Sequence, residues 1–170
     1  TLMGVSYIHP DGEAEAYASE LCRIGYVDYV VTEDMDTLAH GCPRMIRSCL
    51  DKSIKRKDVV SVISLDKILT DFKMDMKEFT DMCILCGCDY CPTIPGVGTI
   101  RSYNYIQKYK SIENLINSQK CTNIPDEFVK RYSSSRDLFN VFKDKIDIKN
   151  IDISADDNSK EKLIEFLVNE

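Results

Sequence analysis

The amino-acid sequence predicts an α/β fold with a parallel sheet, followed by a part that is entirely helical. Three observations support this prediction: strand, helix and strand patterns alternate over residues 5–32, helical patterns prevail from residue 65 onwards, and 44% of the residues are hydrophobic. A strand, a short crossover and a second strand favour parallel pairing. With 170 residues, the chain can form one domain, or a compact domain with a small appendage.

The first 32 residues predict two strands separated by one helix. Residues 5–8 form a short apolar strand that a Pro-Asp-Gly break follows. Residues 13–23 have helical periodicity, and Gly25 is placed to end that helix. Residues 26–32 (YVDYVVT) are rich in aromatic and β-branched side chains and predict a buried strand.

The remainder of the chain predicts two more strands and then only helices. Residues 44–50 and 59–64 are expected to form strands around the charged turn 52–58. Helices are expected at 65–72 and 76–86, the second with Phe79, Met82, Cys83 and Cys86 on one face. The run CDYCPTIPGVG then interrupts regular structure. Four further helices are expected: 99–109, 112–118, about 125–142 and, after a surface loop, 160–168.

Composition and charge limit the classes of function that the chain can have. The apolar runs are too short to span a bilayer, so no membrane association is expected. The chain begins at Thr1 with LMGVSYI, which is typical of the inside of a fold and indicates a fragment or a partial reading frame. The net charge of −6 divides into −6 for residues 1–95, +4 for residues 96–150 and −4 for residues 151–170. A phosphate-binding surface is compatible with this distribution if cations bridge the acidic part to phosphate.

Three groups of carboxylates stand at the ends of predicted elements. Glu13 and Glu15 lie where a helix begins, Asp34 and Asp36 follow a strand, and Asp89 follows the helix 76–86. Residues two apart point to the same side in an extended segment, so Asp34 and Asp36 can aim at one point. Glu13 and Glu15 can converge only if Glu13 lies in the loop and Glu15 in the first helical turn.

These acids allow two interpretations. Ligands of open α/β sheets bind beyond the carboxyl ends of strands, and oxygen-only donors select hard cations such as Mg²⁺ or Mn²⁺. Two such ions about 4 Å apart support phosphodiester hydrolysis. The alternative is that the acids are solvated helix caps and turn residues, which Asp and Glu commonly are.

A set of ordered motifs favours the metal-site interpretation over the cap-and-turn interpretation. The motifs are GEAEA, TEDMD and CILCGCDYCPTIPGVGTIRSYNYIQKYKSIENLI. In order and spacing they resemble the internal nuclease region of the flap endonuclease/XPG family of structure-specific 5′ nucleases, from Leu2 to about Ile116. The resemblance implies a PIN-like parallel-sheet nuclease core, present in part, and a helix-two-turn-helix element of the helix-hairpin-helix type. It divides the chain into residues 1–90 (internal nuclease part), 91–146 (helix-two-turn-helix) and 147–170 (C-terminal loop and helix).

The same resemblance implies an activity and its site. The family cleaves 5′ flaps and related branched double-stranded DNA, often with 5′–3′ exonuclease activity, in replication and repair, with two Mg²⁺ ions that Mn²⁺ can replace. The five catalytic, metal-binding residues are Glu13 and Glu15 for the first ion and Asp34, Asp36 and Asp89 for the second. The expected DNA contacts are Glu13, Gly87, Asp89, Gly96 and Gly98, and the expected K⁺ ligands are Thr93, Ile94 and Val97. The expected location is the nucleus, or a cytoplasmic replication site if the protein is viral.

The departures from the family leave alternatives open. The two further metal-binding aspartates and the basic arch of the family's N-terminal region have no match here, so the chain should hold about half of a catalytic centre and be inactive alone. It could then be a catalytically incomplete DNA-binding fragment, or an XPG-like or junction-cutting relative. The compact spacing between TEDMD and GCDY fits the flap type best. The family's clamp-binding peptide has no match either, so an interaction with a sliding clamp is not supported.

The cysteines suggest a third functional class, a protein that binds a metal through cysteine. Cys83, Cys86, Cys88 and Cys91 form a C-x2-C-x-C-x2-C pattern, which could hold zinc or an iron–sulfur cluster. Because they fall in a helix and the turn that follows it, we interpret them as buried, reduced thiols. His9 and His40 are isolated in the sequence and are expected in surface or turn positions.

Overall fold

The computed structural model describes residues 6–47, 60–151 and 159–169. The helix α1 (Ala14–Arg23) leads to a small sheet of β1 (Val30–Val31), β2 (Arg44–Arg47) and β3 (Ser61–Ser64), and the short α2 (Asp36–Ala39) connects β1 to β2. The helices α3 (Leu65–Phe72), α4 (Met76–Cys86), α5 (Thr99–Tyr109), α6 (Ile112–Asn117) and α7 (Asp126–Phe139) follow. A 3₁₀ turn, η1 (Ile148–Asn150), and α8 (Ser159–Asn169) complete the described chain.

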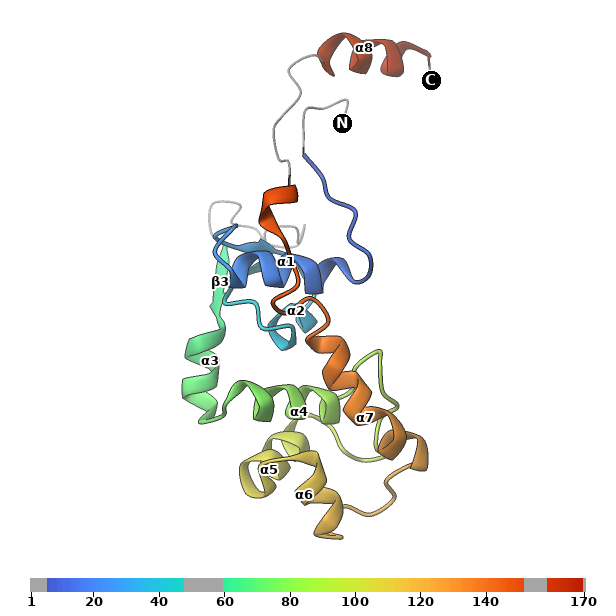
Figure 1. Ribbon diagram of the computed structural model, residues 1–170. Helices are drawn as coiled ribbons and strands as arrows, with labels where there is room; N and C mark the ends of the chain where they lie inside the picture. Colours follow the sequence, from blue (N-terminus) through green and yellow to red (C-terminus); the bar gives the residue numbers. More distant parts are fainter. Residues whose placement is uncertain (1–5, 48–59, 152–158, 170) are drawn as a thin grey trace.

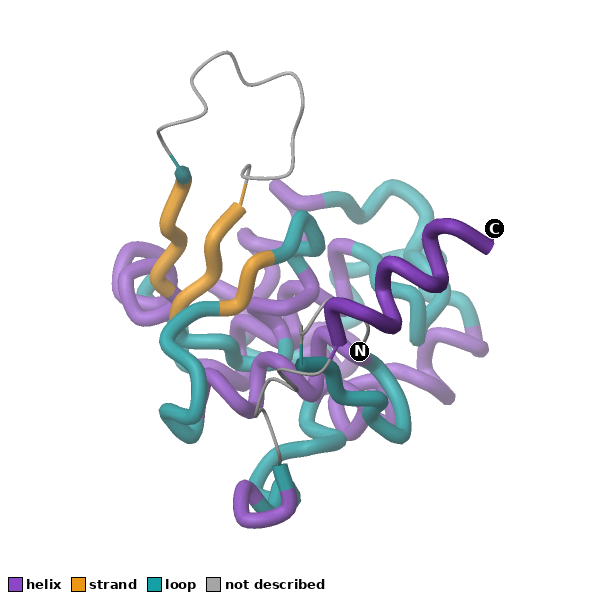
Figure 2. Tube along the Cα trace, turned by 90° about the horizontal axis from the view of Figure 1, so that it is seen from above, coloured by secondary structure: helices purple, strands orange, loops and turns teal. Residues whose placement is uncertain are grey.

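The three strands form a mixed sheet in the order β1-β2-β3 (Figure 2). β1 pairs in parallel with β2, with Val30 opposite Met45. β2 pairs antiparallel with β3, with Met45 opposite Ile63. Met45 on the central strand is completely buried, which sets the register because a shift by one residue would turn it to the other face.

Two predicted strands are wrong in extent. Residues 6–8 form no strand and Tyr7 is 64% exposed, while Val5 lies outside the described residues. Within residues 26–32 the strand comprises only Val30 and Val31, since the preceding residues close the end of α1, where the Tyr26 N–H donates to the Leu21 carbonyl at 2.9 Å. A strand needs a neighbour for its backbone groups, and β-propensity alone does not supply one. The parallel pair of the described residues therefore forms between β1 and β2, and residues 6–8 take no part in it.

The other predicted strands are confirmed in part. Residues 44–47 and 61–64 are strands, whereas the ends of the predicted segments and the turn 52–58 fall mostly in residues 48–59, outside the described part.

The helix predictions are largely confirmed, because local signals define the helix ends. Asp75 and Glu78 form a capping box at the start of α4: the Glu78 N–H donates to Asp75 Oδ1 at 2.8 Å, and the Asp75 N–H donates to Glu78 Oε2 at 3.2 Å. Gly25, with φ of 77°, follows the end of α1 as expected. The helix predicted at 125–142 instead ends at Phe139, and residues 140–145 form turns.

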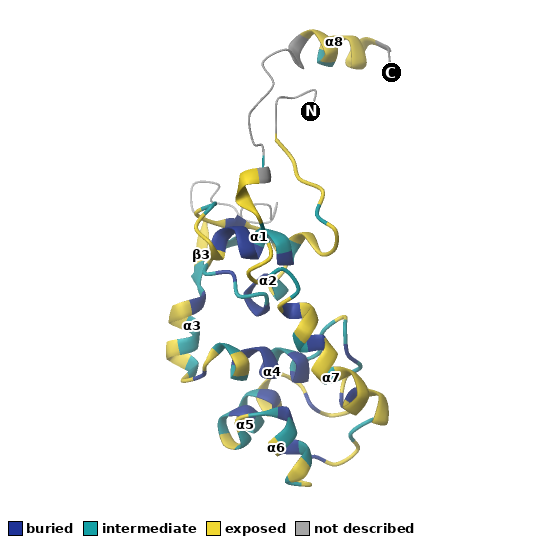
Figure 3. Ribbon diagram, viewed as in Figure 1, coloured by how far each residue is buried: buried dark blue, intermediate teal, exposed yellow. Residues whose placement is uncertain are grey.

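The main core lies around α4, which packs between α5 and α7 (Figures 1 and 3). On the face predicted for α4, Phe79 and Met82 are buried and Cys83 and Cys86 are half-buried, but the opposite side of the helix is buried as well. The core therefore continues across residue 90, where the sequence divides the nuclease part from the helical part, and that division stays a prediction. The fully buried members of this core include Ile84, Leu85, Ile106, Leu115 and Phe128.

The far end of the chain stands apart. In Figure 1, α8 lies beyond the end formed by α1 and the sheet, away from the other helices. Four of its apolar residues are exposed (Ile164, Phe166, Leu167 and Val168), and Leu163 is half-buried. No helix in the described parts of the chain is long and apolar enough to cross a membrane.

Candidate active site

Glu13 and Glu15 occupy the two positions that convergence requires. Glu13 is the residue before α1, with an extended backbone, and its side chain makes no capping hydrogen bond to the helix. Its carbonyl accepts the Tyr17 N–H at 3.1 Å and so begins the helical bonding. Glu15 lies in the first turn and is half-buried. The Glu13 carboxylate is thus at the positive end of the helix without serving as its cap, which leaves it available for a cation.

Asp34 and Asp36 are brought together by a turn and not by an extended segment. After β1, Asp34 Oδ1 accepts the Asp36 N–H at 2.9 Å, and Thr32 Oγ1 accepts the Asp34 N–H at 3.0 Å. Asp36 then begins α2. The expected geometry is therefore corrected: a side-chain-to-backbone turn of the kind that Asp favours brings the two residues together, because the chain reverses direction here.

Asp89 reaches the same region from α4. The helix ends at Cys86, and Gly87 adopts a φ of 115° that turns the chain away. Asp89 lies on the surface between Cys88 and Cys91, which form an isolated antiparallel bridge. The φ of 115° already favours glycine, and a Cβ on Gly87 would also lie 3.0 Å from Thr93 Cγ2, so the fold itself accounts for a glycine there. The role of Gly87 as a DNA contact stays a prediction.

Electrostatics show that the three acidic segments lie near one another. Burial raises the pKa of Asp36, and the negative charges of Asp34, Asp89 and Glu13 raise it further, while His40 acts in the opposite direction. These charges come from the start of α1, the end of β1 and the end of α4. Mutual repulsion of this kind is relieved when a cation binds among the carboxylates.

Two aromatic side chains that were not predicted as site residues lie at this acidic cluster. Burial raises the pKa of Tyr90 to about 12, and Glu13, Asp36 and Asp89 contribute to the increase. Burial lowers the pKa of His40, against the effects of a hydrogen bond to Phe139 and of the nearby acids. His40 is half-buried at the end of α2, so its predicted turn position is confirmed. Its spacing of four residues from Asp36, on one helical face, could have indicated its closeness to the acids.

The donor set fits a hard cation in its chemistry, since all five predicted ligands are carboxylates. The carboxylates are, however, not gathered closely around one point. Within residues 6–47, 60–151 and 159–169, no three Asp, Glu, His or Cys side chains are arranged closely enough to hold a metal ion by themselves. The acids of this chain therefore form a loose cluster that other ligands, such as water or further side chains, would have to complete.

The glycine-rich turn between α4 and α5 lies at the beginning of a long helix. The Val97 N–H donates to the Ile94 carbonyl at 3.0 Å, and Gly96 has a φ of 77°, a conformation that favours glycine. Gly98 is the residue before α5, and a Cβ there would meet no atom within 4 Å. Arg101, which the sequence prediction missed, donates from Nη1 to the Gly96 carbonyl at 2.7 Å and holds the turn in place.

The predicted K⁺ ligands belong to this turn. Thr93 is exposed, whereas the side chains of Ile94 and Val97 are buried in the core. Only the backbone carbonyls of Ile94 and Val97 could therefore face a cation, and this assignment stays a prediction.

The cysteines of the C-x2-C-x-C-x2-C pattern are free thiols in the structure. Burial raises the pKa of each of them, so the protonated thiol is the stable form. Cys83 lies within α4 and Cys91 is buried beside α7, where its Sγ is 3.9 Å from the Phe128 carbonyl. Cys91 is buried as expected, whereas Cys83, Cys86 and Cys88 are half-buried, and the interpretation of all four as reduced thiols stays a prediction.

These observations define a class of protein: an α/β core with a carboxylate cluster drawn from three segments, joined to a helical pair that a glycine-rich turn precedes. The sequence profile of the XPG I-region matches residues 4–89, half of the chain. The chain belongs to the XPG I-region family.

Similar proteins agree with this family membership. The flap endonuclease 1 of Enterocytozoon bieneusi (strain H348) is 43% identical over 138 residues, which cover 81% of this chain and 37% of that protein. The flap endonuclease 1 of Glycine max is 40% identical over 172 residues, covering 99% of this chain and 44% of that protein. The solved structure of flap endonuclease-1 from Methanococcus jannaschii has a TM-score of 0.77 at 27% identity, covering 99% of this chain and 48% of the other. The chain thus spans less than half the length of each of these relatives.

Proposed function

We propose that this chain belongs to a structure-specific DNA nuclease, a 5′-flap endonuclease with 5′–3′ exonuclease activity that acts on branched or flapped double-stranded DNA in replication and repair, in the nucleus. One observation carries the proposal: acids from α1, β1 and α4 lie close enough for Asp34, Asp89 and Glu13 to raise the pKa of Asp36. Caps and turn residues that merely face solvent would not need to gather from three separate segments.

The carboxylates would hold two Mg²⁺ ions, which Mn²⁺ can replace. Glu13 and Glu15 would bind the first ion, and Asp34, Asp36 and Asp89 the second, in part through water. When bound, such ions supply the charge that activates a water molecule and stabilises the leaving oxygen of a phosphodiester. The protein's own contribution is to hold the acids in place. The bond from the Asp36 N–H is made to Oδ1 of Asp34, so Oδ2 would be the oxygen that binds the ion.

The turn before α5 would bind the DNA backbone. Gly96 and Gly98 have no side chains to obstruct a phosphate, and the N-terminus of an eleven-residue helix favours an anion. Carbonyls of Ile94 and Val97, with Thr93, would bind K⁺ there. Glu13, Gly87 and Asp89 would contact DNA on the acidic side. Because the acidic cluster is open, the chain by itself is expected to bind DNA and to cleave it negligibly.

The test removes charge while keeping shape. In the complete protein, Asp34→Asn or Asp89→Asn should nearly abolish cleavage of a 5′-flap substrate in Mg²⁺, while flap-DNA affinity stays within a few-fold. An amide is nearly isosteric with a carboxylate, but it lacks the charge that binds the ion. Cleavage rates and affinities are measured over a range of Mg²⁺ concentrations.

Asp66→Asn is the matched control. Asp66 is an exposed residue in the first turn of α3, outside the acidic cluster, so its substitution should leave cleavage unchanged. If the Asp34 and Asp89 variants cleave as fast as the Asp66 variant, these acids hold no catalytic ion and the assignment is wrong.

A further inference from the structure

The segment that leaves α7 returns to α1 and contacts it along its length. We call residues 139–144 the strap. The ring of Phe142 packs edge-on against Tyr17, with centroids 5.2 Å apart, and lies 3.4 Å from the position of a Cβ on Gly12. Further along, the Asp144 N–H donates to Glu20 Oε1 at 2.8 Å. The strap thus contacts residues on both sides of Glu13 and Glu15, at a distance of more than a hundred residues in sequence.

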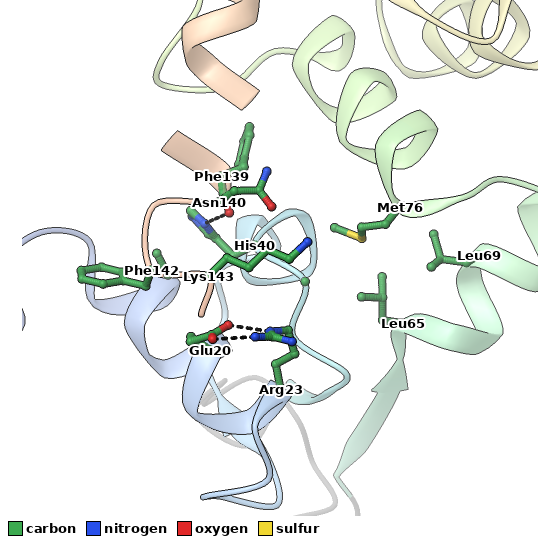
Figure 4. A pocket seen from close by; sticks show the side chains of 12 residues that line it. Glu20, Arg23, His40, Leu65, Leu69, Met76, Phe139, Asn140, Phe142 and Lys143 are labelled. Atoms are coloured by element: carbon green, nitrogen blue, oxygen red, sulfur yellow. Dashed lines mark hydrogen bonds and ion pairs between the residues drawn. The ribbon is translucent and has the colours of Figure 1, made fainter. Parts of the chain in front are cut away.

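Glu20 is the buried anchor of this contact. It is only 4% exposed, and Arg23 donates to both of its carboxylate oxygens, from Nε at 2.6 Å and from Nη2 at 2.7 Å (Figure 4). Arg23 Nη2 also contacts Asp144 Oδ1 at 2.5 Å. A carboxylate is rarely buried unless it is paired, so the position of Glu20 within α1 is accounted for by Arg23 together with the strap.

The strap also contacts α2. His40 Nδ1 lies 3.2 Å from the Phe139 carbonyl, and its ring packs against Phe139 with centroids 5.1 Å apart. A cavity of about 180 Å³ lies among Glu20, His40, Phe139 and Phe142, as Figure 4 shows. Because close packing does not fill this space, the polar bonds of Glu20 and the ring contact of Phe142 must hold the strap in register with α1.

We propose that Glu20 and Phe142 are positioning residues, which fix the first turn of α1, and with it Glu13 and Glu15, relative to α7. The inference rests on the proposed function, since it assigns these two acids to a cation. On the other side of the strap, α7 is held to α4. Arg136 of α7 binds the buried Asp81 of α4, and α4 is the helix that leads to Asp89. The strap therefore links the helices that carry the two sides of the acidic cluster.

The test measures Mn²⁺ binding to the complete protein by electron paramagnetic resonance. Glu20→Gln and Phe142→Ala should each weaken Mn²⁺ binding by about tenfold, as is typical when the support of a metal ligand is lost. Phe142→Leu, which keeps an apolar contact, should retain most of the affinity. The matched control is Glu127→Gln, which breaks an exposed pair with Arg131 on α7 at the same 2.6 Å, and it should have no effect.

Hydrogen exchange separates this inference from the proposed function. The variants Glu20→Gln and Phe142→Ala, here called the strap variants, should both speed exchange of the Tyr17 amide in the first turn of α1. They should leave exchange in α5 unchanged. Folded strap variants with wild-type Mn²⁺ affinity would overturn the positioning role, and unchanged exchange in α1 would overturn the contact itself. If Phe142→Ala does not fold, Glu20→Gln and Phe142→Leu decide by the same two measurements. Absence of Mn²⁺ binding by the wild-type complete protein would instead overturn the proposed function, whatever the exchange rates.

Discussion

At the scale of single residues, Asp36 is a carboxylate whose ionised form the acidic cluster destabilises. It is half-buried, and burial together with the charges of Asp34, Asp89 and Glu13 raises the pKa of its carboxyl. A raised pKa in the folded state means that folding disfavours the ionised form, so this group destabilises the cation-free protein at neutral pH. The penalty is present above the pKa of the folded state and is relieved as the pH falls through it.

Asp36→Asn should therefore stabilise the chain in the absence of divalent cations. At pH 7 with a chelator, we expect the free energy of unfolding to rise by up to about 1 kcal/mol, a small value because Asp36 is partly solvated. The gain should shrink as the pH is lowered and the wild-type carboxyl becomes protonated. Urea denaturation at several pH values measures it, with the exposed Asp66→Asn as the control. A loss of stability at pH 7 would show that the acids do not repel one another.

At the scale of elements, one guanidinium joins three helices. Arg136 of α7 donates to both oxygens of Asp81 in α4, at 2.5 and 2.7 Å, and to both oxygens of Glu113 in α6, at 2.5 and 2.9 Å. Asp81 is completely buried and also accepts the Ile112 N–H at 3.0 Å. Hydrogen bonds from Arg136 lower the pKa of Glu113 to about 2. The contribution of Glu113 to stability is thus present above its unfolded pKa of 4.5 and is lost as the pH falls towards 2.

Arg136→Met should be severely destabilising. It leaves the Asp81 carboxylate buried without its cation, and breaking a buried pair in this way costs about 3–5 kcal/mol. Arg131→Met on the same helix is the matched control, because Arg131 pairs with Glu127 in an exposed position and should contribute about 1 kcal/mol or less. Chemical denaturation compares the two variants. Equal, small losses would mean that the buried Asp81 side chain needs no cationic partner.

At the scale of the whole molecule, the opposing charges of the chain are separated. Residues 96–150 carry +4 while the first 95 residues carry −6, and the acidic cluster lies in the latter. The helices α5, α6 and α7 belong to the positive block (Figure 1). Phosphate contacts should therefore come mainly from these helices and from the turn before α5, and affinity for double-stranded DNA should fall as salt rises.

Gly98→Val tests whether that turn is the contact. The structure has open space around a Cβ at this position, so the fold should survive while the phosphate is kept away. We expect duplex affinity to fall about tenfold, the equivalent of one hydrogen bond to a charged group. The dependence on salt should stay the same, because no charge is removed. Fluorescence anisotropy at several salt concentrations measures both, and Ser133→Val on the exposed face of α7 is the control. Full affinity in the Gly98 variant would place the DNA contact elsewhere.

How far the sequence could predict this protein depended on whether a feature is local. Helix ends followed from nearby residues, as in the Asp75–Glu78 capping box and the glycine after α1. The acidic motifs and the IPGVG turn carried the family resemblance, and the XPG I-region match confirms it. The strands were less well predicted, since residues 26–29 have strand composition but lie against no neighbouring strand.

The sequence by itself determined most of the helices and the family, because periodicity, capping and motif spacing act over a few residues. Only the tertiary structure decided that α4 is buried on two sides, that Arg136 joins Asp81 and Glu113, and that the strap reaches Glu20. These contacts join segments separated by 23 to 124 residues. No local pattern encodes such pairings, since they depend on which surfaces meet when the core excludes water.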